Sequence, residues 1–150
     1  MDLKSKLIKK TDIGELYKVY DNDTNNIYFK LRNVKLLYDI QKYKKIFYLK
    51  WSINNSEDSN DIRILEDSLR KHFNLELVES NVKVKYDGIK ELTTKLKISK
   101  DYYNIIETID VLEEFLEKGQ IYDIILYPFN VYIENSIIKY SLYFKKILKV

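Results

Sequence analysis

The sequence predicts a mainly β protein in which an antiparallel barrel or sandwich carries two inserted helices. About seven or eight short segments alternate apolar and polar residues, which is the period of a strand. Only two segments space their apolar residues as a helix does, and helices and strands do not alternate as in parallel α/β proteins. The fourteen Tyr also suit β-structure. We expect one domain spanning residues 1–150.

The first half of the chain predicts three strands, at Glu15–Tyr20, Ile27–Tyr38 and Tyr43–Ile53. The turn residues Asp and Asn at 21–26 separate the first two. In the third, the apolar face is Phe47, Leu49, Trp51 and Ile53, so we assign Trp51 to the core. Helical spacing then predicts a helix at Asp61–Phe73, capped by Ser59 or Asp58 and ended by a left-handed Asn74. Residues 1–11 are either a further strand or a flexible basic arm.

The second half predicts strands at Leu75–Ser80, Val82–Tyr86 and Leu92–Ile98, with a hairpin turn at Asp87-Gly88. A second helix is expected within Tyr103–Lys118, followed by strands Ile121–Tyr127 and Phe129–Glu134. Pro128 lies between these two strands and indicates an edge, a bulge or a break, because proline cannot donate to a ladder. A tight turn at 134–136 leads into a terminal strand, 137–150.

Several kinds of chemistry lack the residues they need. The chain has no Cys, one His (His72) and three Gly, which excludes disulfides, thiolate zinc sites and Gly-rich phosphate loops. Asp110, Glu113, Glu114 and Glu117 have the residue types of a nuclease metal site, but a solvated acidic helix face is favoured. We therefore expect no enzyme, no cofactor and no metal. No apolar run reaches the roughly 18 residues of a membrane span, so we expect no membrane association and a cytoplasmic, non-secreted protein.

Lysine and tyrosine recur on the polar faces of the predicted strands. In the terminal strand, Ile138, Tyr140, Leu142 and Phe144 form an apolar face. The opposite face holds Lys139, Tyr143, Lys145 and Lys149, and similar faces hold Lys44, Tyr48 and Lys50, then Lys83 and Lys85, then Lys95 and Lys97. Lysines on such faces would bind phosphates while tyrosines, Tyr28 and Tyr132 included, stack on bases. From the pattern alone, an ordinary sheet whose lysines protect its edges and faces is about equally favoured.

The order of these segments resembles the OB-fold single-stranded DNA-binding proteins of large double-stranded DNA viruses, a group similar to the T7-type protein. The resemblance covers residues 27–150: the strand pair Phe29–Ile53, the helix, the hairpin VKVKYDGIKELTTKLKIS, and Tyr122–Val150 with its Lys139-Tyr140 pair. It implies an antiparallel OB-like barrel with two helices. Two departures are Ser141, where the family often has glycine, and a basic rather than acidic C-terminus.

The resemblance implies sequence-independent binding of single-stranded DNA in viral DNA replication, recombination or repair. The candidate phosphate ligands are Lys44, Lys50, Lys95, Lys97, Lys139, Lys145 and Lys149, and the candidate stacking residues are Tyr48 and Tyr143. The acidic segment Glu107–Glu117 would recruit replication proteins, and a homo-oligomer is compatible with the sequence. The alternative is a non-enzymatic protein-interaction or virion structural module with a Tyr-rich interface.

Overall fold

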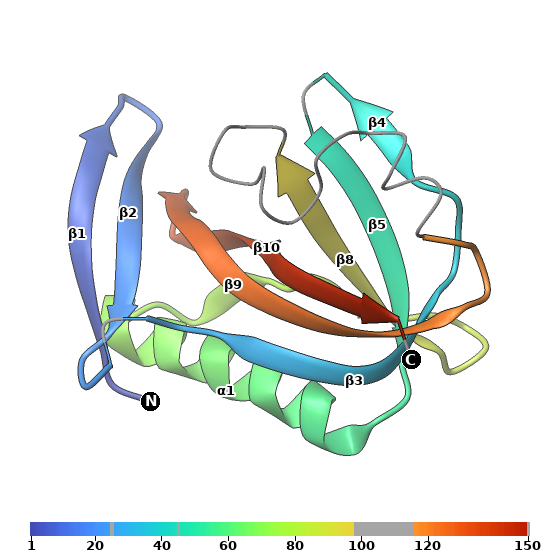
Figure 1. Ribbon diagram of the computed structural model, residues 1–150. Helices are drawn as coiled ribbons and strands as arrows, with labels where there is room; N and C mark the ends of the chain where they lie inside the picture. The colour runs from blue at the N-terminus through green and yellow to red at the C-terminus, as the bar shows by residue number, and fades with distance from the viewer. Residues whose placement is uncertain (25, 45, 98–115, 150) are drawn as a thin grey trace.

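The computed structural model of the protein describes residues 1–24, 26–44, 46–97 and 116–149 (Figure 1). The side chains of Lys97, Phe129, Lys145, Lys146, Leu148 and Lys149 are not described. The described residues form one helix and ten strands: β1 (Leu3–Lys10), β2 (Gly14–Asp21), β3 (Phe29–Leu36), β4 (Gln41–Tyr43), β5 (Ile46–Ile53), α1 (Ser56–Phe73), β6 (Leu77–Glu79), β7 (Val82–Val84), β8 (Lys90–Lys97), β9 (Ile121–Glu134) and β10 (Ile137–Lys149).

Five of the strands close into a barrel in the order β3–β5–β8–β10–β9 and back to β3. A five-stranded Greek-key barrel of this size is the OB-like architecture expected from the sequence. The expectation of purely antiparallel pairing is wrong, because β8 and β10 run parallel where Lys95 pairs with Tyr143. An odd number of strands cannot close with every neighbouring pair antiparallel, so at least one parallel pair is unavoidable. The barrel is therefore mixed.

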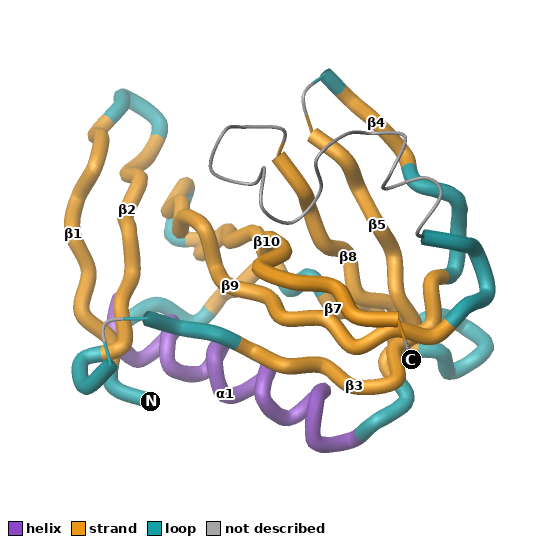
Figure 2. The backbone as a smooth tube through the Cα atoms, viewed as in Figure 1, coloured by secondary structure: helices purple, strands orange, loops and turns teal. Residues whose placement is uncertain are grey.

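The remaining strands extend the barrel sheet at its edges. The β1–β2 hairpin joins the far end of β9, where Gly14–Tyr17 pair with Val131–Glu134. In Figure 2 this hairpin stands beside the barrel, with α1 running below both. Strand β4 pairs with β5, β7 with β8, and β6 runs parallel to the start of β10. The segment 3–10 is thus a paired strand in this structure.

Trp51 lies at the centre of the core, as expected from its apolar face. It is fully buried and meets the rings of Tyr122 and Phe144 edge-on, each with a centroid distance of 5.8 Å. Its indole N–H donates to Oγ1 of buried Thr94 at 2.8 Å, which satisfies the one polar atom of the side chain. The other three residues of the predicted apolar face of β5 are buried as well.

The helix prediction for Asp61–Phe73 is confirmed, but α1 begins five residues earlier, at Ser56. Its N-cap is Asn55, whose side chain accepts from the Glu57 N–H at 2.8 Å, so the predicted caps Ser59 and Asp58 are wrong. Asp58 instead accepts the backbone N–H of Arg32 from β3 at 2.9 Å, and its burial raises the pKa of the carboxyl. Asn74 ends the helix with φ 54° and ψ 46°, as expected.

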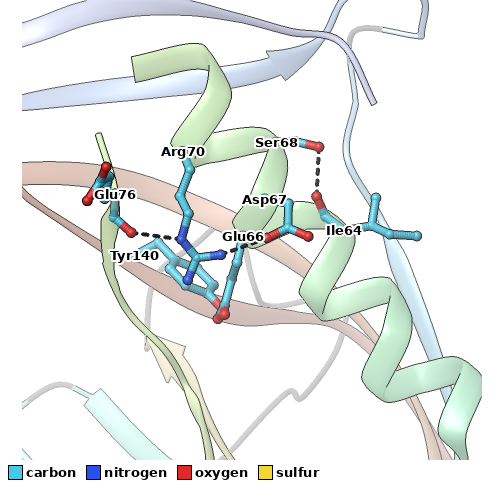
Figure 3. Close-up of polar contacts among 7 residues, drawn as sticks. All are labelled: Ile64, Glu66, Asp67, Ser68, Arg70, Glu76 and Tyr140. Atoms are coloured by element: carbon cyan, nitrogen blue, oxygen red, sulfur yellow. Dashed lines mark hydrogen bonds and ion pairs between the residues drawn. The ribbon is translucent and has the colours of Figure 1, made fainter. Parts of the chain in front are cut away.

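A buried polar contact fixes α1 to the barrel (Figure 3). The hydroxyl of Tyr140 on β10 donates to the carboxylate of Glu66, beside the apolar contacts that Leu65 and Leu69 make with the core. Burial, then repulsion by the Glu66 charge, raises the pKa of Tyr140 well above its usual value, so this hydroxyl keeps its proton. Near the end of α1, the Arg70 Nε–H donates to the backbone carbonyl of Glu76 at 3.0 Å, so the helix is also bonded to the segment that leads into β6.

Several predicted boundaries shift. Tyr43–Ile53 divides into β4 and β5 because a tight turn places Lys44 in the left-handed region, with φ 57°. The two strands expected around Pro128 are one strand, β9, and the proline lies beside a bulge opposite Tyr140–Leu142. The short strand β6 covers only the middle of the predicted segment Leu75–Ser80, and β7 covers only the first three residues of Val82–Tyr86. The hairpin turns at 87–88 and 134–136 are confirmed by the positive φ of Gly88, Asn135 and Ser136.

The expectation of two helices is met by one helix in the described residues. The second prediction, Tyr103–Lys118, falls outside them except for residues 116–118, which are not helical. The acidic segment Glu107–Glu117 lies outside them as well, apart from its last two residues.

Candidate nucleic-acid interface

A groove of about 480 Å³ opens on the outer surface of the barrel, over the line where β8 and β10 run parallel. Residues of β2, β6, β7, β8, β9 and β10 surround it, together with the link between β6 and β7. The lining residues are Leu16, Glu79, Ser80, Asn81, Lys83, Thr93, Lys95, Asn130, Tyr132, Lys139, Tyr140, Ser141 and Tyr143. Three lysines thus meet Tyr132 and Tyr143 in one concave surface, while the Tyr140 side chain turns to Glu66 of α1.

Strand register brings aromatic and cationic side chains into a line across the sheet. Tyr48 on β5 pairs with Lys95 on β8, Lys95 with Tyr143 on β10, and Tyr143 with Tyr127 on β9. The Lys95 Nζ lies 5.6 Å from the Tyr48 ring centroid, and the Tyr127 and Tyr143 rings are 6.3 Å apart. Tyr28, half exposed, extends the line with a centroid distance of 6.5 Å to Tyr127. We call these five residues the tyrosine row.

A second line crosses the sheet at the other end of the groove. Leu16 on β2 pairs with Tyr132 on β9, Tyr132 with Lys139 on β10, and Lys139 with Glu79 on β6. Between the two lines, Asn81 joins β8 and β10 where their own pairing ends. Its carbonyl accepts the Thr93 N–H at 3.0 Å, and its side-chain amide donates to the Tyr140 carbonyl at 2.9 Å. These bonds satisfy the Thr93 N–H and the Tyr140 carbonyl, which the pairing of β8 with β10 leaves without a partner from the other strand.

Lys95 is the most perturbed cation of the groove. Its ammonium donates to Ser141 Oγ at 2.9 Å. Burial lowers the pKa of Lys95, and attraction to the Glu79 carboxylate offsets part of that shift. A phosphate placed here would meet an ammonium that is already partly stripped of water, which strengthens the attraction between them.

Three lysines in or near the groove form ion pairs with carboxylates. The Lys139 Nζ lies 3.2 Å from a carboxylate oxygen of Glu134. The Nζ atoms of Lys50 and Lys85 lie 3.5 and 3.6 Å from Oε1 of Glu91, whose side chain is only 4% exposed. These ion pairs orient the lysines, and a bound phosphate would share or exchange these partners. Within the described residues, no group of three or more acidic, His or Cys side chains is placed to hold a metal.

The structure brings together five of the nine predicted site residues: Tyr48, Lys50, Lys95, Lys139 and Tyr143. Lys50 pairs with Thr93, one of the lining residues, on the strand next to the groove. Tyr143 lies in the row but is only 6% exposed, so Tyr48 and Tyr28 present more ring surface. Lys44 lies away from the groove in the β4–β5 turn, 5.4 Å from the Tyr43 ring centroid.

The remaining three predicted lysines are placed by backbone alone. Lys97 pairs with Ile46, Lys145 lies at a bulge in β10, and Lys149 pairs with Tyr122. The bulge reverses the alternation, because Ile147 packs against the core although the period-two pattern puts it on the face of Lys139.

Sequence reasoning missed Tyr127, Asn81 and Asn130. Tyr127 belongs to a run in β9 that is apolar on both faces, so its periodicity did not reveal which side faces outward. Asn81 looked like an ordinary turn residue between two short strands. Its role depends on β8 and β10 lying together, and the sequence offers no local signal of that.

One comparison with known proteins finds a similar fold. A solved structure described as the single-stranded DNA-binding protein from bacteriophage Enc34 in complex with ssDNA superimposes with a TM-score of 0.57. The alignment covers 98% of this chain and 95% of that one, at 11% sequence identity. The likeness is one of fold. No protein-family model matches the sequence, and neither does any curated protein. No helix in the described part of the chain is long and apolar enough to cross a membrane.

Proposed function

We propose that the protein binds single-stranded DNA without sequence preference along the groove and the tyrosine row. The observation that carries the proposal is the alignment of Tyr48, Lys95 and Tyr143 across three strands of the barrel. Every base has a π-face and every nucleotide a phosphate, so rings beside ammonium groups bind any sequence. The whole-chain likeness to a phage protein solved with ssDNA supports the same function.

The exposure and position of each side chain indicate its role in the proposed binding. Tyr48 and Tyr28 have accessible rings on which bases stack, and each stacked base contributes about 1–3 kcal/mol. Lys95, Lys139 and Lys83 line the groove and neutralise phosphates, releasing counterions and making binding sensitive to salt. Tyr143, which is buried, packs beside the Tyr127 ring. We propose a binding protein without catalysis.

The decisive experiment is a fluorescence titration of labelled oligo-dT at several salt concentrations, with poly-dA and mixed sequences for comparison. We expect binding that weakens steadily with salt and differs little between sequences. Tyr48→Ala should weaken binding about 5- to 150-fold, which corresponds to one lost stack, whereas Tyr38→Ala, an exposed tyrosine outside the groove, should not. Absence of binding at 50 mM salt would refute the proposal.

The biological setting that we propose is replication, recombination or repair of viral DNA, as in the resembling family of large double-stranded DNA viruses. The acidic segment Glu107–Glu117 is the proposed contact for replication proteins. Neutralising its carboxylates would abolish that contact and leave affinity for oligo-dT intact. Unchanged recruitment of such proteins by the neutralised variant would contradict this assignment.

The second candidate function is a protein-interaction module. It is favoured by exposed apolar side chains on or next to β6 and β7, where Leu77 is 61% exposed, Val84 68% and Tyr86 fully exposed. Such a module would show self-association or capture of a partner protein, with no affinity for oligo-dT at low salt. Size-exclusion chromatography beside the titration separates the two functions.

A further inference from the structure

The β1–β2 hairpin presents a basic face beside the groove. Lys4 pairs with Tyr20 across the two strands and Lys6 pairs with Lys18, so these four side chains share one face. The Lys4 and Lys18 ammonium nitrogens lie 5.9 and 5.4 Å from the Tyr20 ring centroid. All three lysines are exposed. We call this set the hairpin face: Lys4, Lys6, Lys18 and Tyr20.

The hairpin face is continuous with the groove. Leu16, Lys18 and Tyr20 are alternate residues of β2 and therefore point to the same side of the sheet. Leu16 lines the groove and pairs with Tyr132, which lines it as well. In Figure 1 the β1–β2 hairpin stands next to the end of β9, and the two are paired through Gly14–Tyr17 of β2 and Val131–Glu134 of β9. A chain leaving the groove past Tyr132 meets Lys18 next.

The opposite face of the hairpin fixes its orientation. Val19 is buried, the Tyr17 ring packs on Phe73 of α1 at a centroid distance of 5.0 Å, and His72 Nε2 lies 2.8 Å from Ser5 Oγ. These contacts hold the hairpin against the end of the helix. The basic face is thus presented by a strand pair that is already ordered, so binding incurs little ordering cost.

The Lys6–Lys18 pair indicates an anionic ligand. Like charges directly opposite each other in a strand pair destabilise it. Among the described residues, neither lysine forms an ion pair, although Lys10 at the end of the same strand pairs with Glu15. A phosphate backbone across the hairpin would relieve this repulsion.

We propose that the hairpin face is a second contact region for the nucleic-acid strand, continuing the path from the groove. The proposal rests on the proposed function of the groove. In it, Lys6 and Lys18 bind phosphates, while Tyr20, flanked by Lys4 and Lys18, receives a base. The protein therefore binds a longer segment than the groove alone accommodates, and short oligonucleotides do not engage the hairpin.

The test compares Lys6→Gln/Lys18→Gln with a control that neutralises two exposed cations of α1, Arg63→Gln/Lys71→Gln. Both are titrated with oligo-dT from about 4 to 16 nucleotides, the range of site sizes known for single barrels of this type. Two lost phosphate contacts should reduce the salt slope by about 1.4 and, at 0.1 M salt, the affinity for long oligonucleotides by about 25-fold. Affinity for the shortest oligonucleotide that binds should be unchanged.

Thermal unfolding gives a second readout. Because the substitution removes a like-charge pair, the hairpin variant should unfold at the same temperature as the wild type or higher, so weaker binding would not reflect misfolding. If the hairpin variant matches the α1 control at every length, the hairpin proposal is overturned while the groove function stands. If the wild type binds no oligonucleotide at all, both proposals fail.

Discussion

Lys95 gives the sharpest test of how the groove works, because it combines a central position with a shifted pKa. It pairs with both Tyr48 and Tyr143, and its ammonium donates to Ser141 Oγ. The substitution Lys95→Gln removes the charge and leaves an amide that reaches the same neighbourhood. Lys95→Arg keeps the charge. Comparison of these two variants therefore separates the effect of losing the charge from the effect of losing the native side chain.

The expected magnitude follows from counterion release. One phosphate contact with a single strand contributes about 0.7 to the slope of log affinity against log salt, so at 0.1 M salt its loss costs about fivefold in affinity. Lys95→Gln should show both changes. Lys95→Arg should keep the wild-type slope even if its affinity falls. The measurement is an oligo-dT titration at four salt concentrations, with Lys71→Gln on α1 as the control for an exposed charge.

The pH dependence has opposite signs for stability and binding. Burial lowers the pKa of Lys95 in the folded protein below the ordinary value of 10.5. At pH values between the lowered pKa of the folded protein and 10.5, the unfolded chain binds more protons at Lys95 than the folded chain does. The contribution of Lys95 to the free energy of unfolding therefore rises with pH in this interval. Affinity for DNA falls over the same interval, because the ammonium loses its charge. Subtracting the profile of Lys95→Gln from that of the wild type isolates both effects.

An unchanged salt slope in Lys95→Gln would refute the reasoning, because it would mean that no phosphate lies at this position. A wild-type alkaline profile that coincides with that of Lys95→Gln would contradict the lowered pKa. If Lys95→Gln kept the wild-type salt slope but lost affinity, the role of Lys95 would instead be to support the Tyr48 ring.

Three further predictions concern affinity and stability. Glu79→Gln should raise oligo-dT affinity on the order of threefold, because it removes a negative charge from the groove. Thr94→Val should lower the free energy of unfolding by about 1–3 kcal/mol, measured by urea and Trp51 fluorescence, because it leaves the buried indole N–H without an acceptor. Gly14→Ala should destabilise by about 1–3 kcal/mol, since a Cβ there lies 2.4 Å from the Ile133 carbonyl oxygen.

Each of these predictions has a control in the same element or nearby. For the groove carboxylate it is Glu76→Gln, exposed and outside the groove, and equal gains in both variants would contradict a local effect. For the buried threonine it is Thr93→Val on the other face of β8; equal stability of the two would argue against the indole contact. For the glycine it is Lys10→Ala, and a Gly14→Ala protein as stable as this control would mean that β2 shifts without cost.

The sequence predicted the parts of the fold that depend on local pattern. Period-two alternation identified β5 and its buried face around Trp51, and helical spacing identified α1 up to its Asn74 cap. Boundaries moved where a polar residue found a distant partner. Asp58 was predicted as a cap, yet it bonds the backbone of Arg32, 26 residues away in the chain. That bond exists only after β3 and the helix have met.

The candidate site was predictable in its residue types and not in its grouping. Alternation correctly placed Tyr48 and Lys95 outward from their strands, since both strands have one clearly apolar face. It did not reveal that Tyr143 would be covered, that Lys44 would turn away, or that the bulge at Lys145 would reverse the end of β10. Register and bulges depend on cross-strand packing, which a single-strand pattern does not contain.

The position of the groove follows from closing a barrel with five strands. One neighbouring pair has to be parallel, and here it is β8 and β10, which share the single register pair Lys95–Tyr143. Beyond that pair the strands diverge, and Asn81 bonds both of them across the gap. The hollow at the parallel pair is thus a consequence of the topology, and the proposed DNA binding depends on the lysine and tyrosines beside it. We therefore expect Asn81→Ala to disturb the groove and to leave the barrel largely intact. Its affinity for oligo-dT should fall, while its unfolding temperature should stay close to that of the wild type.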